Sequence, residues 1–341
     1  MEMTLALVVI TVVVALIFDF VNGFHDSANS IATIVSTQVL KPQAAVVWAA
    51  FFNFIAMFIF APRVADTIAR IVKINPQDSM YVNVILYGLL GATIWDLVTW
   101  WWKLPTSSSH ALIGGLSGAG AAHGGWEVLN WPSLFEISIF IFIAPLMGFA
   151  LGMFFMVAIS WIFQNWGPAR VNNIFRKGQF VSAALYSIGH GANDAQKTMG
   201  IIVAVLFAAK LVPRDLELSL YDPDTLWIIL SCQIAMALGT AFGGWRIVKT
   251  MAMKVTKLRP VGGFCAESAG TVTLYLATYL GVPVSTTHTI VGSIIGVGSL
   301  GNKVSAVKWG IAQKIAWAWI LTIPASAGIA SLIYLLTSYI K

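Results

Sequence analysis

Two short polar motifs interrupt an otherwise apolar chain, and they are near-copies of one another. The first, Gly-Phe-His-Asp-Ser-Ala-Asn, covers residues 23–29, and the second, Gly-Ala-Asn-Asp-Ala-Gln-Lys, covers residues 191–197. Each places an aspartate directly after an imidazole or an amide, as His25-Asp26 and Asn193-Asp194. Because charge at membrane depth is costly, a duplicated acid there indicates a duplicated function.

A second pair of motifs is rich in hydroxyl groups. Pro105 is followed by Thr-Ser-Ser-Ser-His, and Pro283 is followed by Val-Ser-Thr-Thr-His. Proline suits the first turn of a helix, so each motif is predicted to begin a helix whose free N–H groups and positive dipole end favour an anion. The hydroxyl donors at these helix starts are Ser107, Ser108, Ser109, Ser285, Thr286 and Thr287.

Together the two kinds of motif predict a site for a small tetrahedral oxyanion. Hydroxyl and N–H donors can bind such an anion without a cluster of arginines. The aspartates repel an anion unless it arrives protonated or a cation lies between. Phosphate carries protons near neutral pH and sulfate does not, so the acid pair favours phosphate. The same carboxylates can hold Na⁺ or a proton and so couple anion entry to a gradient.

Composition predicts the elements that must position these groups. The chain is 58% hydrophobic and only 10% charged, whereas soluble domains average about 25% charged residues. Apolar runs long enough to span a bilayer recur along the chain, with residues 5–18 read as a retained first helix. The sequence therefore predicts an all-α polytopic protein of the plasma (inner) membrane, in contact with the lipid bilayer. The net charge of +6 is a signal of topology rather than of nucleic-acid binding.

The two halves of the chain repeat, with repeat one over residues 1–165 and repeat two over residues 171–341. Gly114, Gly118 and Gly120 recur as Gly292, Gly296 and Gly298, each at the same distance from its proline. Segment 244–260 carries five basic residues and no acid, so it is expected in the cytoplasm.

The equivalent segment 62–81 is nearly balanced in charge and is expected outside. Equivalent loops on opposite sides predict inverted-topology repeats. In such a fold, broken helices and re-entrant hairpins meet at one site near the midplane, and the glycine before each aspartate is expected to permit a break.

Several polar residues admit more than one interpretation. His110, His288 and His190 are read as supporting residues, with packing or capping at least as plausible as ligation. Asp19 and Asp96 stand alone and could be structural hydrogen-bonding groups or functional acids. An intramembrane hydrolase with a serine, a histidine and an aspartate fits badly, because every motif is doubled and a hydrolase needs one nucleophile. A passive channel is a further alternative.

The four motifs together resemble the paired signatures of the inorganic phosphate transporter (PiT) family, and the likeness covers essentially the whole chain. The Phe-His-Asp form of the first motif is most similar to the bacterial low-affinity permeases, a branch that resembles proton symporters and in part carries phosphate as a divalent-metal complex. Na⁺-coupled branches have an Asn-Asp pair in both repeats, and here His25 replaces the first Asn. Glu267 is present in repeat two, whereas Asn53 stands at the matching place in repeat one.

The resemblance implies roles for individual residues. Phosphate would be bound by the aspartates, by their neighbouring amides Asn29 and Asn193, and by the six hydroxyl residues given above. The coupling ion would involve His25, Asp26, Asn193, Asp194 and Glu267, with Gln196 and Lys197 in support. We therefore expect a phosphate-importing secondary symporter, driven by protons or alternatively by Na⁺. It is expected not to be an enzyme, to have no resident cofactor or metal and to bind no nucleic acid; a homodimer is possible. A same-fold permease for sulfate is the closest alternative.

Overall fold

The computed structural model describes residues 5–213, 216–254, 256–300 and 307–339, and over these ranges the chain is almost entirely helical with no β-strand. The first half contains α1 (Leu5–Ser36), α2 (Pro42–Ile55), the 3-10 turn η1 (Ala56–Phe58), α3 (Arg63–Ala69), α4 (Tyr81–Trp101), α5 (Ser108–Gly124), η2 (Trp126–Val128) and α6 (Trp131–Ile162). The second half contains α7 (Pro168–Ala208), α8 (Pro223–Phe242), α9 (Trp245–Lys254), α10 (Pro260–Tyr279), α11 (Thr286–Leu300) and α12 (Trp309–Tyr339).

Five of these helices, α1, α4, α6, α8 and α12, are long and apolar enough to cross a membrane. Most of the surface of α6 and α12 lies outside the protein core. It exposes large apolar side chains such as Phe142, Phe154 and Leu332. Apolar surface of this kind is stable against lipid tails rather than water. The prediction of an all-α polytopic membrane protein is confirmed.

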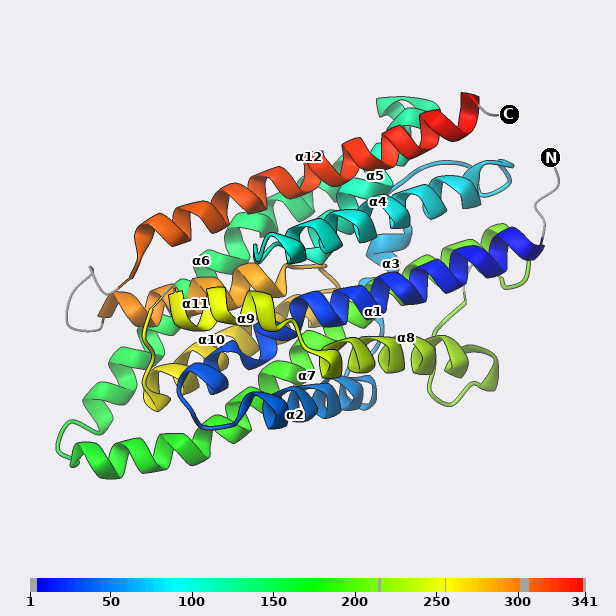
Figure 1. Ribbon diagram of the computed structural model, residues 1–341. Helices are drawn as coiled ribbons and strands as arrows, with labels where there is room; N and C mark the ends of the chain where they lie inside the picture. The colour runs from blue at the N-terminus through cyan, green and yellow to red at the C-terminus, as the bar shows by residue number, and fades with distance from the viewer. Residues whose placement is uncertain (1–4, 214–215, 255, 301–306, 340–341) are drawn as a thin grey trace.

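Two helical hairpins enter the molecule from opposite ends. The α4–α5 hairpin runs from the end that carries both termini toward the middle, and the α10–α11 hairpin runs from the end where α6 turns into α7 (Figure 1). The helix breaks inside them fall at residues 102–107 and 280–285, around Pro105 and Pro283. The proline motifs therefore mark the interruptions, as the sequence predicted, and the hydroxyl residues lie in the first turns of α5 and α11.

The prediction that glycine breaks the helices at the aspartate motifs is wrong. Helix α1 runs unbroken through Asp26, and α7 runs unbroken through Asp194. A Cβ added at Gly23 would collide with the backbone carbonyl of Met236 on α8, and one added at Gly191 would collide with the carbonyl of Asn53 on α2. These glycines allow two helices to approach closely instead of interrupting one.

The matched glycines of the two repeats serve the same purpose in the hairpins. Helix α5 packs along α12, and α11 packs along α6. A Cβ at Gly114 would collide with the Ile323 carbonyl, and a Cβ at Gly292 would collide with the Pro145 carbonyl. Helices α5 and α11 are therefore each seated by backbone contact on a long outer helix that contains an internal proline.

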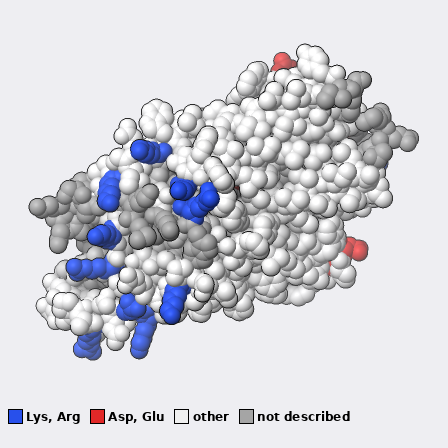
Figure 2. Space-filling model, viewed as in Figure 1, with Lys and Arg blue, Asp and Glu red and all other residues white. Residues whose placement is uncertain are grey.

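Basic side chains gather at the end of the molecule opposite the termini (Figure 2). This end carries the α1–α2 loop, the start of α7, the α9–α10 loop and the start of α12, with exposed residues Lys41, Arg170, Lys177, Lys257, Arg259, Lys308 and Lys314. The segments expected to be plain loops each contain a short helix, α3 in residues 62–81 and α9 in residues 244–260.

Candidate substrate site

The two signature aspartates meet in the centre of the molecule. Asp26 on α1 and Asp194 on α7 are 2% and 0% exposed. The Thr286 hydroxyl, at the start of α11, lies 3.5 Å from Asp26 Oδ2 and 3.3 Å from Asp194 Oδ2. Residues from three distant parts of the sequence thus converge on one buried point.

The last polar residue of each aspartate motif contacts the hydroxyl motif of the other half. The Asn29 amide donates to Thr286 at 3.1 Å and to Thr287 at 2.9 Å. Lys197, which occupies the equivalent place in the second motif, donates to Ser109 and also pairs with Asp194. Lys197 is the single buried Lys or Arg among the residues whose burial the structure gives.

The hydroxyl residues of the two motifs have different hydrogen-bonding roles. Ser107 and Ser285 accept hydrogen bonds from the backbone N–H groups of His110 (3.3 Å) and His288 (3.1 Å), so these two serines cap α5 and α11. The Ser108 hydroxyl is buried and has no hydrogen-bond partner within the described part of the chain. Ser108 therefore keeps its hydroxyl proton free, beside the Asp96 carboxylate, whereas Thr286 directs its own toward Asp26 and Asp194.

His25 connects Asp26 to Thr99 on α4 and to Thr106 in the first hydroxyl motif. Its Nδ1 lies 2.7 Å from Asp26 Oδ1, and its Nε2 lies 3.2 Å from Thr99 Oγ1 and 3.3 Å from Thr106 Oγ1. Thr106 belongs to the first hydroxyl motif, so the sequence alone could place it near the site. Thr99 lies at the end of α4, and only the fold brings it to the site.

A cluster of ionisable groups lies beside Thr286. Asp26, His190 and Asp194 each offer one ligand atom, and these atoms lie within 4.8 Å of one another. His190 Nε2 is 3.2 Å from Asp194 Oδ2, and the ring's Nδ1 contacts Ser30 and Asn53, both at 3.3 Å. All three groups are buried, so the cluster can hold a small cation or share a proton.

Glu267 lies in a separate polar cluster between α1, α7 and α10. It accepts hydrogen bonds from Thr33 (2.5 Å), Ser182 (2.5 Å) and Gln179 (3.0 Å). None of the interactions described for Glu267 joins it directly to Asp26 or Asp194, so this acid belongs to a different set of contacts from the aspartate pair.

Other predicted residues hold the backbone around the site. Asn193 binds the α10–α11 connection, through Val282 O at 3.3 Å and Val284 N at 3.4 Å. Gln196 accepts from the N–H of Val64 at 2.9 Å and donates to the carbonyl of Ala61 at 3.0 Å, so it fixes the start of α3.

The two hydroxyl-motif histidines pack against each other. The rings of His110 and His288 are 4.7 Å apart, and His288 stacks on Trp319 at 3.8 Å. These contacts join α5 and α11 to α12.

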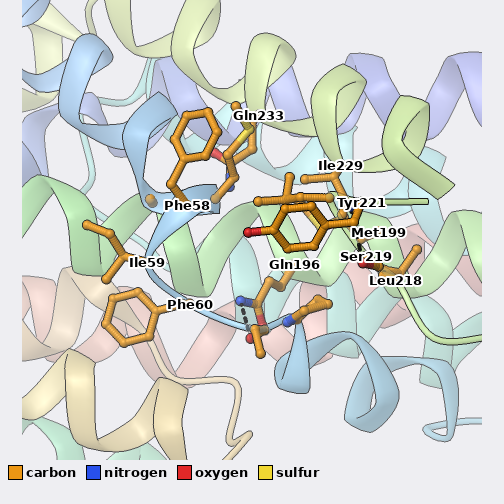
Figure 3. Close-up of a pocket in the computed structure, with 15 residues that line it drawn as sticks. Phe58, Ile59, Phe60, Gln196, Met199, Leu218, Ser219, Tyr221, Ile229 and Gln233 are labelled. Carbon is orange, nitrogen blue, oxygen red and sulfur yellow. Dashed lines mark hydrogen bonds between the residues drawn. The ribbon is translucent and has the colours of Figure 1, made fainter. Parts of the chain in front are cut away.

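A pocket of about 240 Å³ opens next to Gln196, between η1, α7, α8 and residues 218–221 (Figure 3). Gln196 and Met199 from α7, Gln233 from α8 and Tyr221 are among the residues that line it. Gln196 follows Asp194 by two residues, so its side chain leaves α7 on a different face. The pocket therefore lies on the other side of α7 from Asp194.

Comparison with known proteins identifies the family. The model of the phosphate transporter family matches residues 22–330. The probable low-affinity inorganic phosphate transporter of Rhizobium meliloti is 52% identical over 336 residues and 98% of each chain. The protein of the same name from Bacillus subtilis is 41% identical over the full length of both chains. A solved structure, the sodium-dependent phosphate transporter, matches with a TM-score of 0.89 at 24% identity over 99% of this chain and 100% of that one, and so shares the fold. The chain belongs to the phosphate transporter family.

Proposed function

We propose that this multi-pass plasma-membrane protein is a secondary symporter that imports inorganic phosphate with protons. The observation that carries this proposal is the position of Thr286, whose hydroxyl lies within 3.5 Å of both Asp26 and Asp194. One buried point thereby combines anion donors with groups that can bind a positive charge.

The donors around this point suit a tetrahedral oxyanion. The starts of α5 and α11 supply free backbone N–H groups, Ser108 and Thr286 supply hydroxyls, and Lys197 supplies a cation. The aspartates then select among oxyanions. A protonated phosphate oxygen can donate to a carboxylate, whereas a fully ionised sulfate would meet Asp26 and Asp194 as like charges.

We propose that the coupling ion binds between Asp26, His190 and Asp194. A proton bound there reduces the repulsion between the two carboxylates and the incoming anion. Na⁺ is the alternative occupant, and a divalent cation carried with phosphate is a second one; carboxylate oxygens suit either cation. No resident cofactor enters the proposal.

We propose further that residues 1–165 and 171–341 are inverted repeats that alternate access to this site. Three observations support the proposal. The hairpins enter from opposite ends (Figure 1), Asn29 and Lys197 make matching contacts with the opposite hydroxyl motif, and Gly114 and Gly292 make matching contacts with α12 and α6. The basic end in Figure 2 would face the cytoplasm.

Competition in proteoliposomes tests the substrate assignment. Accumulation of labelled phosphate against a gradient is expected under an inward proton gradient, which separates a symporter from a passive channel. A large excess of sulfate should leave this uptake unchanged, and an excess of unlabelled phosphate should abolish it. Equal inhibition by both anions would show a general oxyanion permease instead.

A further inference from the structure

Asp19 is a buried acid that the site described above does not use. It lies on α1, two helical turns before Asp26, and is 0% exposed. Neither of its carboxylate oxygens accepts a hydrogen bond from any group in the described part of the chain. The side chains of Thr198 on α7 and Asn22 on α1 lie beside the carboxylate, and the Thr198 hydroxyl and the Asn22 carbonyl oxygen also have no partner there.

An ionised carboxylate in this position would be strongly destabilising. Removing a charge from water without a partner costs several kcal/mol. The charges that face Asp19 come from α7, where Asp194 repels it and Lys197 attracts it, and the thiol of Cys232 faces it from α8. Lys197 already pairs with Asp194 and donates to Ser109, so it is not free to neutralise a second acid.

A proton on Asp19 would allow the unpaired oxygens of Asp19, Asn22 and Thr198 to form hydrogen bonds with one another. The carboxylic acid O–H can donate to the Asn22 carbonyl oxygen, and the Thr198 hydroxyl can donate to the other oxygen of Asp19. A metal cation fits less well, because the Lys197 ammonium lies nearby and the one other acid that faces this position, Asp194, is already paired with that ammonium.

The pocket of Figure 3 is lined by residues of the same stretches of α7 and α8 that face Asp19. Gln196 and Met199 line the pocket, and in the sequence of α7 they stand on either side of Lys197 and Thr198. Gln233 also lines the pocket, and it follows Cys232 in the sequence of α8. The Gln233 carbonyl oxygen is buried and unpaired among the described residues. Asp19 itself does not line the pocket; it faces Thr198 and the Lys197–Asp194 pair on α7 and Cys232 on α8.

We propose that Asp19 is a proton-carrying residue of the transport cycle. When the site faces one side, the ionised Asp19 accepts one proton from hydronium, which leaves water. When the site faces the other side, the acid returns the same proton to water. The inference rests on the proposed proton symport and assigns to Asp19 a step that phosphate binding does not require.

Asp19→Asn tests this role, because asparagine resembles the neutral acid in shape but cannot exchange a proton. In proteoliposomes, the variant should keep phosphate–phosphate exchange at equal pH on both sides. It should lose phosphate accumulation driven by a pH gradient by about tenfold or more, since a fixed neutral group cannot couple. Asp19→Glu should restore accumulation, and Asp224→Asn, at an exposed position on α8, should behave as the wild type in both assays.

The outcomes separate the inference from the proposed function. If the wild type ignores a pH gradient, proton symport itself is wrong. If the wild type responds and Asp19→Asn accumulates phosphate equally well, only the role of Asp19 is wrong. If Asp19→Asn loses phosphate exchange as well as accumulation, the proposed role of Asp19 is also wrong. The same holds if Na⁺ stabilises the wild-type protein against unfolding and Asp19→Asn removes this effect, because Asp19 would then bind Na⁺. Independently of transport, infrared spectra of the wild type should contain a protonated-carboxyl band that is absent in Asp19→Asn. Identical carboxyl bands in the two proteins would contradict the proposal.

Discussion

The Asn29 amide donates a hydrogen bond of 2.9 Å to the Thr287 hydroxyl, although the two residues are 258 positions apart. Lys197 makes the corresponding contact with Ser109. Each half of the chain thus holds the hydroxyl motif of the other half, and neither half can form the site alone.

Asn29 and Thr287 should act as a coupled pair. Replacing either with an apolar residue, Asn29→Ala or Thr287→Val, should weaken phosphate binding by about fivefold, because a buried hydrogen bond contributes about 1 kcal/mol. The double variant should be little worse than Asn29→Ala alone, since Asn29→Ala already removes the hydrogen bond that Thr287→Val removes. Calorimetric titration with phosphate measures the three affinities. Fully additive losses would show that the two residues act independently.

The buried Lys197–Asp194 pair should govern stability as well as transport. Asp194→Asn leaves the Lys197 ammonium buried without its carboxylate, which should lower the free energy of unfolding by about 3–5 kcal/mol and abolish uptake. Adding Lys197→Met removes the unpaired charge and should recover most of the stability while uptake stays absent. Thermal unfolding in detergent and uptake in proteoliposomes measure the two effects. Uptake close to that of the wild type in Asp194→Asn would contradict the site.

Asp26→Asn should abolish uptake with a smaller effect on stability. Asp26 contacts the imidazole of His25 rather than a fixed cation, so its removal leaves no permanent buried charge unpaired. Membrane insertion, followed by extraction and size-exclusion chromatography, should match the wild type. A folded variant that still accumulates phosphate would remove Asp26 from the mechanism.

Two glycine substitutions distinguish close helix packing from simple helix flexibility. Gly292→Ala would force a Cβ into the Pro145 carbonyl and should destabilise the protein by about 1–3 kcal/mol. Gly328→Ala on α12 is the matched control, because nothing lies within 4 Å of its added Cβ; it should be neutral or slightly stabilising. Thermal unfolding compares the two. Equal melting temperatures would mean that α11 does not sit tightly on α6.

A contact at the end that carries the termini should make stability depend on pH. The Asp78 carboxylate accepts from the backbone N–H of Met80 at 2.8 Å and contacts His123 at 3.0 Å, and these interactions lower the pKa of Asp78 below its ordinary value of 3.8. A lowered pKa means that the stabilisation is present above 3.8 and is lost as pH falls through the lowered pKa. The difference in melting temperature between the wild type and Asp78→Asn should therefore vanish in acid. A constant difference across this range would contradict the contact.

The sequence predicted much of this arrangement because its strongest signals were duplicated. Composition gave the helical membrane class, and the prolines located the breaks in both hairpins. The glycines misled because a glycine before a buried acid can mean either a helix break or a close approach, and only the facing helix decides. The carbonyls of Met236 and Asn53 occupy the space beside Gly23 and Gly191.

Residues that reach the site through the fold alone could not be foreseen. Thr99 contacts His25 from the end of α4, and the pairing of α5 with α12 depends on packing between helices that are far apart in sequence. Asp19 was visible as a lone acid, but its unpaired state depends on neighbours from α7 that no local pattern reveals.

Uptake of labelled phosphate in proteoliposomes under separately imposed H⁺ and Na⁺ gradients tests the central claim most directly. The account predicts that an inward proton gradient drives accumulation without Na⁺ and that a Na⁺ gradient at equal pH does not. Measuring both with and without Mg²⁺ would show whether the phosphate travels as a metal complex. Accumulation that follows the Na⁺ gradient and ignores pH would contradict proton coupling at this site.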